Sequence, residues 1–260
     1  MPYVNVNNLK IFYSENNIEG IPILFIHGWL GSSHEWIHQV CYFNSKQHII
    51  ILDLPGFGKS GKPKTKYSID FFSTQIIEFL NIFGYKKVIL VGHSLGGVIA
   101  LNIAIKNLNL VKKLILINTS ASFSQSNKDK FILFWVNLIF KLSYKKFLKS
   151  IIKRILSAPN ENKEFKKLYF SAIKIPKSIV LNTFKNMTRK FHLNKEGVGI
   201  SQPTLIIYGS EDKIILKSMF NNLDALIPNS EKIIFENGMH RVMVNLFMKV
   251  NKIIENFLNN

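Results

Sequence analysis

An apolar run at residues 88–91 leads directly into Gly-His-Ser-Leu-Gly-Gly, residues 92–97, and an apolar segment with helical spacing follows. This pattern predicts a tight turn between a strand and a helix, with the central serine projecting above the end of a sheet. The flanking glycines leave room for the backbones that close around the turn. The pattern therefore predicts Ser94 as a nucleophile, with the N–H of Leu95 at the helix start placed to bind an oxyanion.

Short apolar runs recur along the chain and alternate with segments of helical length. Continuous runs of this kind are typical of strands that are buried on both faces. Because strands alternate with helices, the sequence predicts an α/β fold with a parallel sheet covered by helices on both faces. The expected strands are 21–27, 49–54, 88–91, 114–117, 204–208 and 231–235, with 4–13 as an edge strand or hairpin arm; the expected helices are 68–83, 95–107 and 241–258.

The alternation stops after residue 120 and resumes near residue 200. No strand-like run stands out in between, and apolar side chains fall at helical spacing before a lysine-rich stretch that extends to Leu156. We therefore predict an α/β core at 1–120 and 200–260, interrupted by a helical cap at 121–199. Aromatic residues of the cap suggest an apolar acyl pocket, although we expect most of them to fill the core of the cap: Phe131, Phe134, Trp135, Phe140, Tyr144, Phe147, Tyr169, Phe170 and Phe184.

A serine nucleophile needs a base, and the base needs a carboxylate that fixes its tautomer. Asp212 follows the expected strand 204–208, and His240 follows the expected strand 231–235. His240 is the only histidine after Asp212. We predict Ser94, His240 and Asp212 as a catalytic triad, and prefer Asp212 to its neighbour Glu211 because the loop then has one more residue to reach over the sheet edge.

The loop after strand 21–27 is expected to supply a second oxyanion donor. It reads His27-Gly28-Trp29-Leu30-Gly31-Ser32, and the backbone N–H of Trp29 is the candidate. We interpret His27 as a structural residue that hydrogen-bonds the loop rather than as a base. Asp224, which falls in a helix-like segment, is interpreted as a solvated charge.

Five short motifs follow one another along residues 21–250. They are His27-Gly28-Trp29, Asp53-Leu54-Pro55-Gly56-Phe57-Gly58-Lys59-Ser60, Gly92-His93-Ser94-Leu95-Gly96-Gly97, Gly209-x-x-Asp212 and the late His240. In this order they resemble the α/β-hydrolase superfamily. The resemblance implies an eight-stranded, mostly parallel sheet with a cap between strands six and seven. It also implies a Ser-His-Asp triad that works without a metal or an organic cofactor.

The triad predicts a serine hydrolase that cleaves carboxylic esters through an acyl-enzyme, on a small-molecule ester with an apolar acyl group. Within the superfamily, the motifs resemble esterases that remove the methyl ester from pimeloyl groups on acyl carrier protein. They also resemble the menaquinone-pathway synthase that eliminates pyruvate, and broad carboxylesterases. A lyase or C–C hydrolase on the same triad therefore stays open. A non-catalytic binding protein is disfavoured, since binding does not require all three residues.

The formal net charge is +18, which would attract nucleic acid, an anionic membrane surface or an acidic protein. The arginines are Arg154, Arg189 and Arg241, and all other basic residues are lysines. Because base recognition relies on arginine, nucleic-acid binding is disfavoured; lysine enrichment beside abundant Asn and Ile also fits an A/T-rich coding sequence. An acidic acyl carrier protein is a candidate partner. With one cysteine, no signal-like start and no long apolar stretch, we expect a cytoplasmic protein without stable membrane insertion.

Two further motifs have competing interpretations. Residues 56–61 fit Gly-x-Gly-x-x-Gly, but Lys62-Pro63-Lys64 follows where a dinucleotide site would need a helix, so we interpret them as a turn. His34-Glu35-Trp36-Ile37-His38 matches the zinc-protease string His-Glu-x-x-His. A zinc site would need a third ligand, and we predict that the chain holds no metal.

Overall fold

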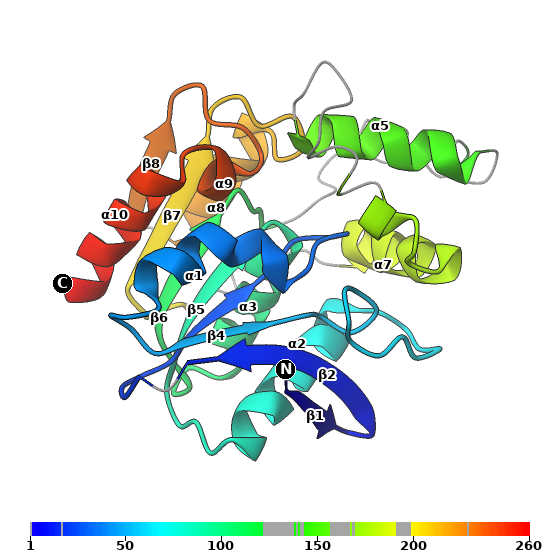
Figure 1. Ribbon diagram of the computed structural model, residues 1–260. Coiled ribbons are helices and arrows are strands. Elements are labelled where there is room, and N and C mark those ends of the chain that lie inside the picture. The colour runs from blue at the N-terminus through cyan, green and yellow to red at the C-terminus, as the bar shows by residue number, and fades with distance from the viewer. Residues whose placement is uncertain are drawn as a thin grey trace.

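The computed structural model describes residues 2–16, 18–121, 138, 140, 143–156, 167, 170–190, 199–227 and 229–260. Its centre is a twisted eight-stranded sheet in the order β1-β2-β4-β3-β5-β6-β7-β8 (Figure 1). β1 and β2 pair antiparallel, β2 pairs antiparallel with β4, and all other pairs are parallel. The strands are β1 Tyr3–Val6, β2 Leu9–Glu15, β3 Ile23–Ile26, β4 Ile49–Leu52, β5 Val88–His93, β6 Val111–Ile117, β7 Thr204–Gly209 and β8 Glu231–Phe235.

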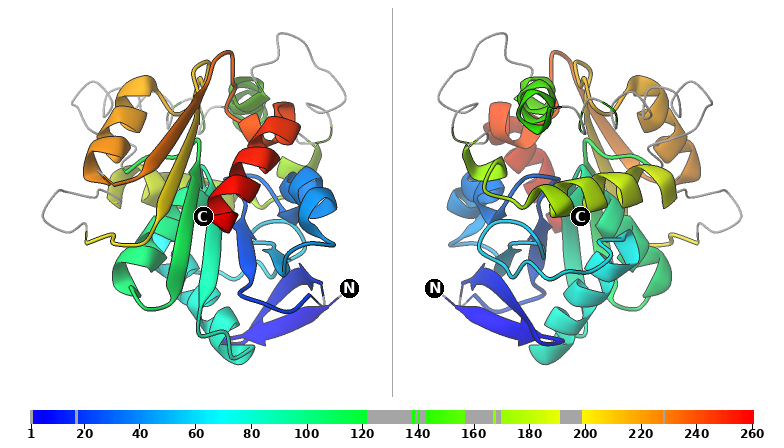
Figure 2. Two further views of the ribbon diagram at one scale, coloured as in Figure 1. Left: turned by 90° about the vertical axis from the view of Figure 1, so that its left-hand side faces the viewer. Right: turned by 90° about the vertical axis from the view of Figure 1, so that its right-hand side faces the viewer.

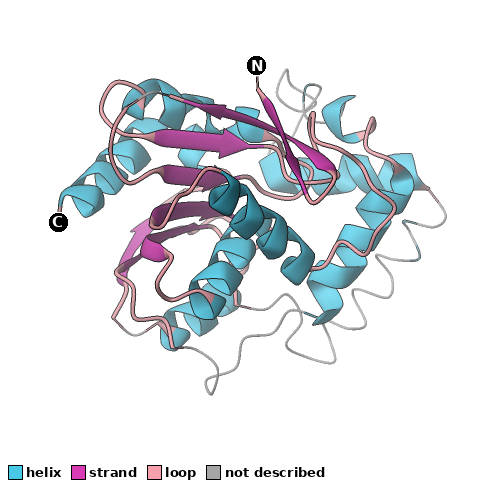
Figure 3. Ribbon diagram, turned by 90° about the horizontal axis from the view of Figure 1, so that it is seen from below, coloured by secondary structure: helices cyan, strands magenta, loops and turns pink. Residues whose placement is uncertain are grey.

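Helices cover both faces of this sheet (Figures 2 and 3). Helices α1 and α10 lie on one face, and α2, α3 and α8 lie on the other. The predicted α/β fold, mostly parallel and sandwiched between helices, is confirmed. The helices are η1 Ser33–Trp36, α1 Ile37–Phe43, α2 Ile69–Ile82, α3 Leu95–Lys106, α5 Tyr144–Leu156, α7 Lys177–Lys190, α8 Lys217–Leu226, α9 Val242–Asn245 and α10 Phe247–Asn259.

The apolar runs form strands because both of their faces are buried. Along β5, Ile89 and Val91 pack into the core under α1 and α10, whereas Val88 and Leu90 pack into the core under α2 and α3. A strand placed between two such cores has no polar face, so its sequence lacks the polar alternation of a half-exposed strand. The expected segment 4–13 forms the hairpin β1–β2, which turns at Asn7 and Asn8 with φ angles of 48° and 62°.

Helix α2 begins and ends at the residues that its sequence predicts. The Ser68 hydroxyl accepts a hydrogen bond from the N–H of Phe71 at 3.2 Å, which caps the first turn. Gly84, just beyond the helix, has φ 72°, a left-handed conformation that favours glycine. The helix packs its apolar side against α3 and the sheet.

The prediction of a single closing helix at 241–258 is wrong, because the segment forms two helices, α9 and α10, which are separated at Leu246. The Gln39 side chain donates to the carbonyl of Met243 at 2.9 Å. In an uninterrupted helix that carbonyl would accept the N–H of Phe247. The segment contains no proline or glycine at the break, so the interruption comes from a tertiary contact rather than from a local sequence signal.

Between β6 and β7 the structure describes helices α5 and α7 (Figure 1). Of the aromatic residues expected in the cap, Phe131, Phe134, Trp135 and Tyr169 lie outside the described residues. The division into a core and a cap at 121–199 stays a prediction. Within the described part of the chain, no helix is both long and apolar enough to cross a bilayer.

Candidate active site

Ser94 occupies the turn between β5 and α3. Its backbone has φ 51° and ψ −115°, a left-handed conformation that costs on the order of 1–3 kcal/mol for a residue with a side chain. Two hydrogen bonds hold the turn: the Ser94 N–H donates to the carbonyl of Ile117 at 3.0 Å, and the Thr119 hydroxyl donates to the Ser94 carbonyl at 2.7 Å. The structure thus places Ser94 at the carboxyl end of the central strand, in the strained turn that the sequence predicts.

The glycines on either side of Ser94 are required by backbone packing. A Cβ atom at Gly96 would collide with the carbonyl of Ile26 in the neighbouring strand, and one at Gly92 would collide with the carbonyl of Gly96. Because both obstacles are backbone atoms, no rotamer change could relieve them. The tight turn therefore depends on these two positions having no side chain.

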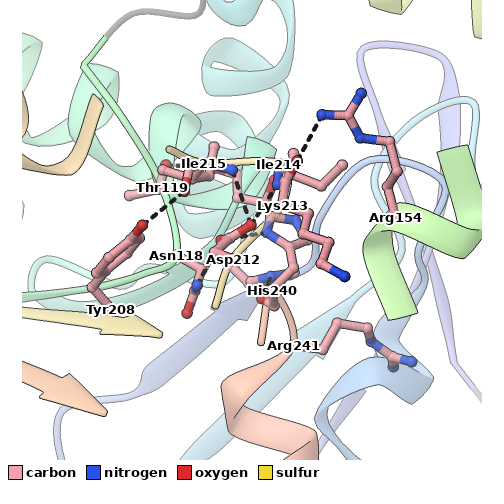
Figure 4. Close-up of polar contacts among 12 residues, drawn as sticks. Asn118, Thr119, Arg154, Tyr208, Asp212, Lys213, Ile214, Ile215, His240 and Arg241 are labelled. Atoms are coloured by element: carbon pink, nitrogen blue, oxygen red, sulfur yellow. Dashed lines mark hydrogen bonds and ion pairs between the residues drawn. The ribbon is translucent and has the colours of Figure 1, made fainter. Parts of the chain in front are cut away.

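His240 and Asp212 form a buried pair (Figure 4). Nδ1 of His240 donates to Oδ2 of Asp212 at 2.8 Å. This bond keeps the imidazole proton on Nδ1 and leaves Nε2 free to accept a proton. Burial lowers the pKa of His240 more than the charge and hydrogen bond of Asp212 raise it, so the imidazole is neutral at neutral pH.

The Asp212 carboxylate accepts hydrogen bonds at both of its oxygens. Oδ1 accepts the N–H groups of Ile214 and Ile215 at 2.7 and 2.9 Å, and Oδ2 accepts Nδ2 of Asn118 at 2.6 Å besides the bond from His240. Burial raises the pKa of Asp212, but His240 and these donors lower it more, and the pKa ends below its ordinary value. The carboxylate is therefore ionised and its orientation is fixed.

The other candidate carboxylates lie away from His240. Glu211 is exposed, and its backbone N–H donates to the carbonyl of Gly238 at 2.8 Å. Asp224 lies on α8, where it pairs with Lys232 at 2.7 Å. The structure therefore brings Asp212, and neither of these two, to His240.

The loop of Ser94 and the loop of His240 meet through His93, the last residue of β5. Its imidazole lies 4.8 Å from that of His240, measured between ring centroids. Its Nε2 donates to the backbone carbonyl of His240 at 2.8 Å. Because Ser94 follows His93 directly, Ser94, His240 and Asp212 lie at the same end of the sheet.

The loop after β3 lies against Ser94. A Cβ atom built on Gly28 would be 3.4 Å from Cβ of Ser94, which places the next residue, Trp29, beside the nucleophile. Among the described residues, the backbone N–H groups of Trp29 and Leu95 have no hydrogen-bond acceptor. His27 is buried and holds the loop, since Nδ1 donates to the carbonyl of Gly28 at 2.8 Å and Nε2 accepts the N–H of Leu54 at 2.9 Å.

The Trp29 side chain connects this loop to the segment between β6 and β7. Its Nε1 donates to the Thr183 hydroxyl of α7 at 2.9 Å. Its ring packs against Phe184 and Phe147, with centroid distances of 5.4 and 6.4 Å. On the far side of the site, Arg154 of α5 donates to the carbonyl of Lys213 at 2.8 Å (Figure 4). Helix α7 therefore contacts the loop of Trp29, and α5 contacts the loop of Asp212.

Four residues that the sequence analysis did not propose take part in this site. They are Asn118, which binds the acid, and Glu35, His93 and Arg241, which connect the loops. Asn118 follows β6 directly, so the rule that side chains after parallel strands gather at one edge of the sheet could have identified it. No comparable signal marks Glu35, because its partners are far apart in the sequence.

The members of the string His34-Glu35-Trp36-Ile37-His38 do not gather around one point in the described part of the structure. The string is divided between η1 and α1, and its members point to different partners. His34 contacts Lys167, His38 stacks on Phe247, and Glu35 points into the protein. Among the residues that the structure describes, no group of three potential ligands gathers around one point.

Comparison with known proteins assigns the family. The model of the alpha/beta hydrolase fold matches residues 21–244. The chain belongs to the α/β-hydrolase fold family. In structure, this α/β hydrolase superposes on a bromoperoxidase from Bacillus anthracis with a TM-score of 0.89, at 20% identity, over 100% of this chain and 99% of that one.

Relatives of this α/β hydrolase include several kinds of hydrolase. It is 29% identical to the uncharacterized hydrolase YugF of Bacillus subtilis, over 86% of this chain and 85% of the relative. It is 27% identical to Epoxide hydrolase 1 of Caenorhabditis elegans, over 99% of this chain and 70% of the relative. It is 31% identical to the pimeloyl-[acyl-carrier protein] methyl ester esterase of Wigglesworthia glossinidia brevipalpis, over 81% of this chain and 86% of the relative. These relatives support a hydrolase activity and differ in the bond that is cleaved.

Proposed function

We propose that this α/β hydrolase cleaves carboxylic esters, with Ser94 as nucleophile, His240 as base and Asp212 as the residue that orients His240. The observation that carries the proposal is the buried His240–Asp212 hydrogen bond of 2.8 Å at the end of the sheet where Ser94 occupies its strained turn. A binding protein has no need for a serine, a neutral imidazole and an ionised carboxylate in this arrangement.

In the proposed reaction, Ser94 Oγ attacks the ester carbonyl while Nε2 of His240 takes the hydroxyl proton. The carbonyl oxygen becomes an oxyanion, which the N–H groups of Trp29 and Leu95 stabilise. The tetrahedral intermediate then expels the alcohol, which His240 protonates, and leaves an acyl ester on Ser94. Water activated by His240 hydrolyses this ester and restores the free serine.

The nucleophile distinguishes ester from epoxide chemistry. A serine that opened an epoxide would become an alkyl ether, which has no carbonyl for water to attack and would stay blocked. A serine that attacks an ester becomes an acyl ester, which water cleaves. Although epoxide hydrolases are among the relatives, Ser94 at the end of β5 therefore favours esters.

The relative that acts on a carrier-bound methyl ester suggests a more specific substrate. On α5 the exposed charged side chains are all basic: Lys145, Lys146, Lys149, Lys153 and Arg154. We propose an acyl ester carried by an acidic acyl carrier protein, which docks on this surface through opposite charge. The apolar side of α5, which includes Phe147, packs against the rest of the protein and leaves the basic side exposed.

The first experiment measures hydrolysis of p-nitrophenyl esters from acetyl to decanoyl. Wild type is compared with Ser94→Ala and with Ser14→Ala, a control at an exposed serine of β2. We expect ester hydrolysis in wild type and in the control, and a loss of several orders of magnitude in kcat for Ser94→Ala. Equal activity of Ser94→Ala and wild type would contradict the proposal. No ester hydrolysis by folded wild type would favour lyase or C–C hydrolase chemistry, which a screen for pyruvate and cleaved C–C products would detect.

The carrier proposal has its own test. We expect Lys145→Glu/Lys149→Glu to lower kcat/KM for a carrier-bound methyl ester by about tenfold or more at low salt, and to leave p-nitrophenyl ester hydrolysis unchanged. The effect should shrink as ionic strength rises. Equal kcat/KM values of the variant and wild type on the carrier-bound ester would contradict docking on α5.

A further inference from the structure

A pocket outside the candidate active site lies beside β2 and β4, on the face of the sheet that carries α1. In Figure 1 these two strands lie below α1. The pocket has a volume of about 570 Å³, which is in the range of small-molecule sites. The described residues that line it include neither Ser94 nor Asp212 nor His240. We call it the β2–β4 pocket and treat it as a separate site.

The floor of the β2–β4 pocket is apolar. Phe12 and Ser14 are two residues apart on β2, so their side chains point to the same face of the sheet, and Ile51 of β4 pairs with Ser14 in the antiparallel ladder. Ile37 and Val40 of α1 form one wall. Ile37 is 42% exposed although it is apolar. An apolar group in the pocket would therefore cover surface that the protein leaves in contact with water.

Lysine side chains stand around this floor. Lys59 and Lys62 come from the loop after β4, and Lys174 comes from the segment before α7. All three residues are exposed. Nζ of Lys59 lies 4.4 Å from the centre of the Phe12 ring, which places a positive charge directly above the floor. Two separate segments of the chain thus bring ammonium groups to one apolar surface.

Asp53 is the one carboxylate among the described lining residues. Its Oδ1 accepts the N–H of Ser33 at 2.6 Å and its Oδ2 accepts the N–H of Lys59 at 2.7 Å, so both oxygens are turned toward backbone donors. The lining residue His34 is neutral, because partial burial and the charge of Lys167 lower its pKa. Three lysines and one aspartate leave the lining with two positive charges in excess.

The ammonium group of Lys62 lacks a close counter-charge. Its Nζ donates to the carbonyls of Gly58 and Ser60 at 2.9 and 3.2 Å, which uses two of its three N–H groups. Within the described residues, neither Lys62 nor Lys174 forms an ion pair with a carboxylate. Burial lowers the pKa of Lys62 more than the charge of Asp53 raises it. A bound anion would offset this cost of the charged form.

We propose that the β2–β4 pocket binds a phosphate monoester of a small apolar alcohol, with its phosphate at Lys62 and Lys174 and its apolar group on the floor. A phosphate monoester carries about 1.5 to 2 negative charges at pH 7, which matches the excess positive charge better than the single charge of a carboxylate. Lysine binds phosphate as a point charge. The bound ester would connect the loop after β4 to the segment before α7. The proposal does not depend on the proposed ester hydrolysis.

Isothermal titration calorimetry with hexyl phosphate tests the site, and inorganic phosphate, hexanoate and hexanol serve as comparisons. Binding at the β2–β4 pocket is the part lost in Ser14→Trp, a substitution that fills the pocket and changes no charge. For this part, we expect hexyl phosphate to bind about tenfold tighter than each comparison compound, because it alone combines a doubly charged group with an apolar chain. The affinity should fall as ionic strength rises.

Charge variants locate the phosphate. We expect Lys62→Gln and Lys174→Gln each to weaken hexyl phosphate binding by about fivefold or more. The matched control is Lys64→Gln, an exposed lysine of the same loop that does not line the pocket, and it should bind like wild type. The lysine variants decide the question even if Ser14→Trp fails to fold.

Three results would overturn the proposal. The first is the absence of hexyl phosphate binding by folded wild type up to about 1 mM. The second is an unchanged affinity in both Lys62→Gln and Lys174→Gln, which would place the bound ester elsewhere on the protein. The third is an equal affinity for inorganic phosphate or for hexanoate at the pocket, which would show that the apolar chain or the second negative charge contributes nothing.

Discussion

At the scale of single residues, the site depends on which atoms carry protons. Asp212 accepts hydrogen bonds from two backbone N–H groups, from Asn118 and from His240. Because Oδ2 of Asp212 can only accept a hydrogen bond, it keeps the proton of the His240 ring on Nδ1. Substitutions that preserve shape but change donors into acceptors, or the reverse, are therefore the most informative at this site.

Asp212→Asn tests the role of the acid. Its amide group can present N–H to Nδ1 of His240, which favours the tautomer with its proton on Nε2, facing the nucleophile. We expect kcat for p-nitrophenyl esters to fall by roughly 10³–10⁴ with little loss of folding. Glu211→Gln, one residue away and exposed, is the control and should retain wild-type kcat. A similar loss in both variants would argue against Asp212 as the acid.

The pH dependence of ester hydrolysis tests the state of His240. Burial lowers the pKa of His240 in the folded protein, so the base stays neutral to a lower pH than a free histidine with a pKa of about 6.5. Activity should fall as pH decreases through this lowered pKa. We therefore expect the acid limb of kcat/KM to have its midpoint below about pH 6.5. A midpoint above about pH 7 would contradict this assignment.

At the scale of helices and strands, the sequence predicts the elements that neighbouring residues determine, through apolar runs or capping residues. It does not predict features that depend on contacts between distant parts of the chain. The strands β3 to β7 follow from apolar runs, and α2 follows from Ser68 and Gly84. The break between α9 and α10 depends on Gln39, which lies about 200 residues earlier in the chain. For the same reason Ser94, Asp212 and His240 could be proposed from their places after strands, whereas Glu35 could not.

The Gln39 side chain connects α1 to the α9–α10 pair, and we expect its removal to destabilise the protein. It is fully buried and donates to the Met243 carbonyl at 2.9 Å and to Oδ1 of Asn251 at 2.8 Å. Gln39→Leu leaves both acceptors without this donor, and we expect the free energy of unfolding, measured with urea, to fall by about 2–3 kcal/mol. Gln39→Leu/Asn251→Leu should recover part of the loss, since both polar partners are then absent. A double variant that is less stable than wild type by the sum of the losses measured in Gln39→Leu and in Asn251→Leu alone would contradict the coupling.

At the scale of the whole molecule, buried ionisable groups make stability depend on pH. His27 and His240 have lowered pKa values in the folded protein, mainly through burial. Glu35 and Asp212 also have lowered pKa values, because electrostatic interactions and hydrogen bonds with their partners outweigh burial. In every case the unfolded chain binds the proton first as pH falls, so acid favours unfolding.

The lowered pKa values define the pH range in which the protein should lose stability. The free energy of unfolding should begin to fall below about pH 6.5, where the unfolded histidines protonate, by up to about 1.4 kcal/mol per pH unit for each of the two. A further decrease should begin near pH 4.5, where the unfolded carboxyl groups of Glu35 and Asp212 protonate but the folded ones do not. Urea titrations at about pH 7.5, 5.5 and 4 measure both steps. Equal stability at all three pH values would show that these groups are not perturbed by folding.

The strand order has a consequence during synthesis on the ribosome. From β3 onward, β5, β6, β7 and β8 join the sheet in the order in which they are made, and chains emerge with their N-terminal part first. A nascent chain can therefore form the Ser94 turn before His240 has been translated. Until β8 and its loop arrive, the growing protein would hold Ser94 without His240, and the proposed ester hydrolysis would begin only when the last edge of the sheet is complete.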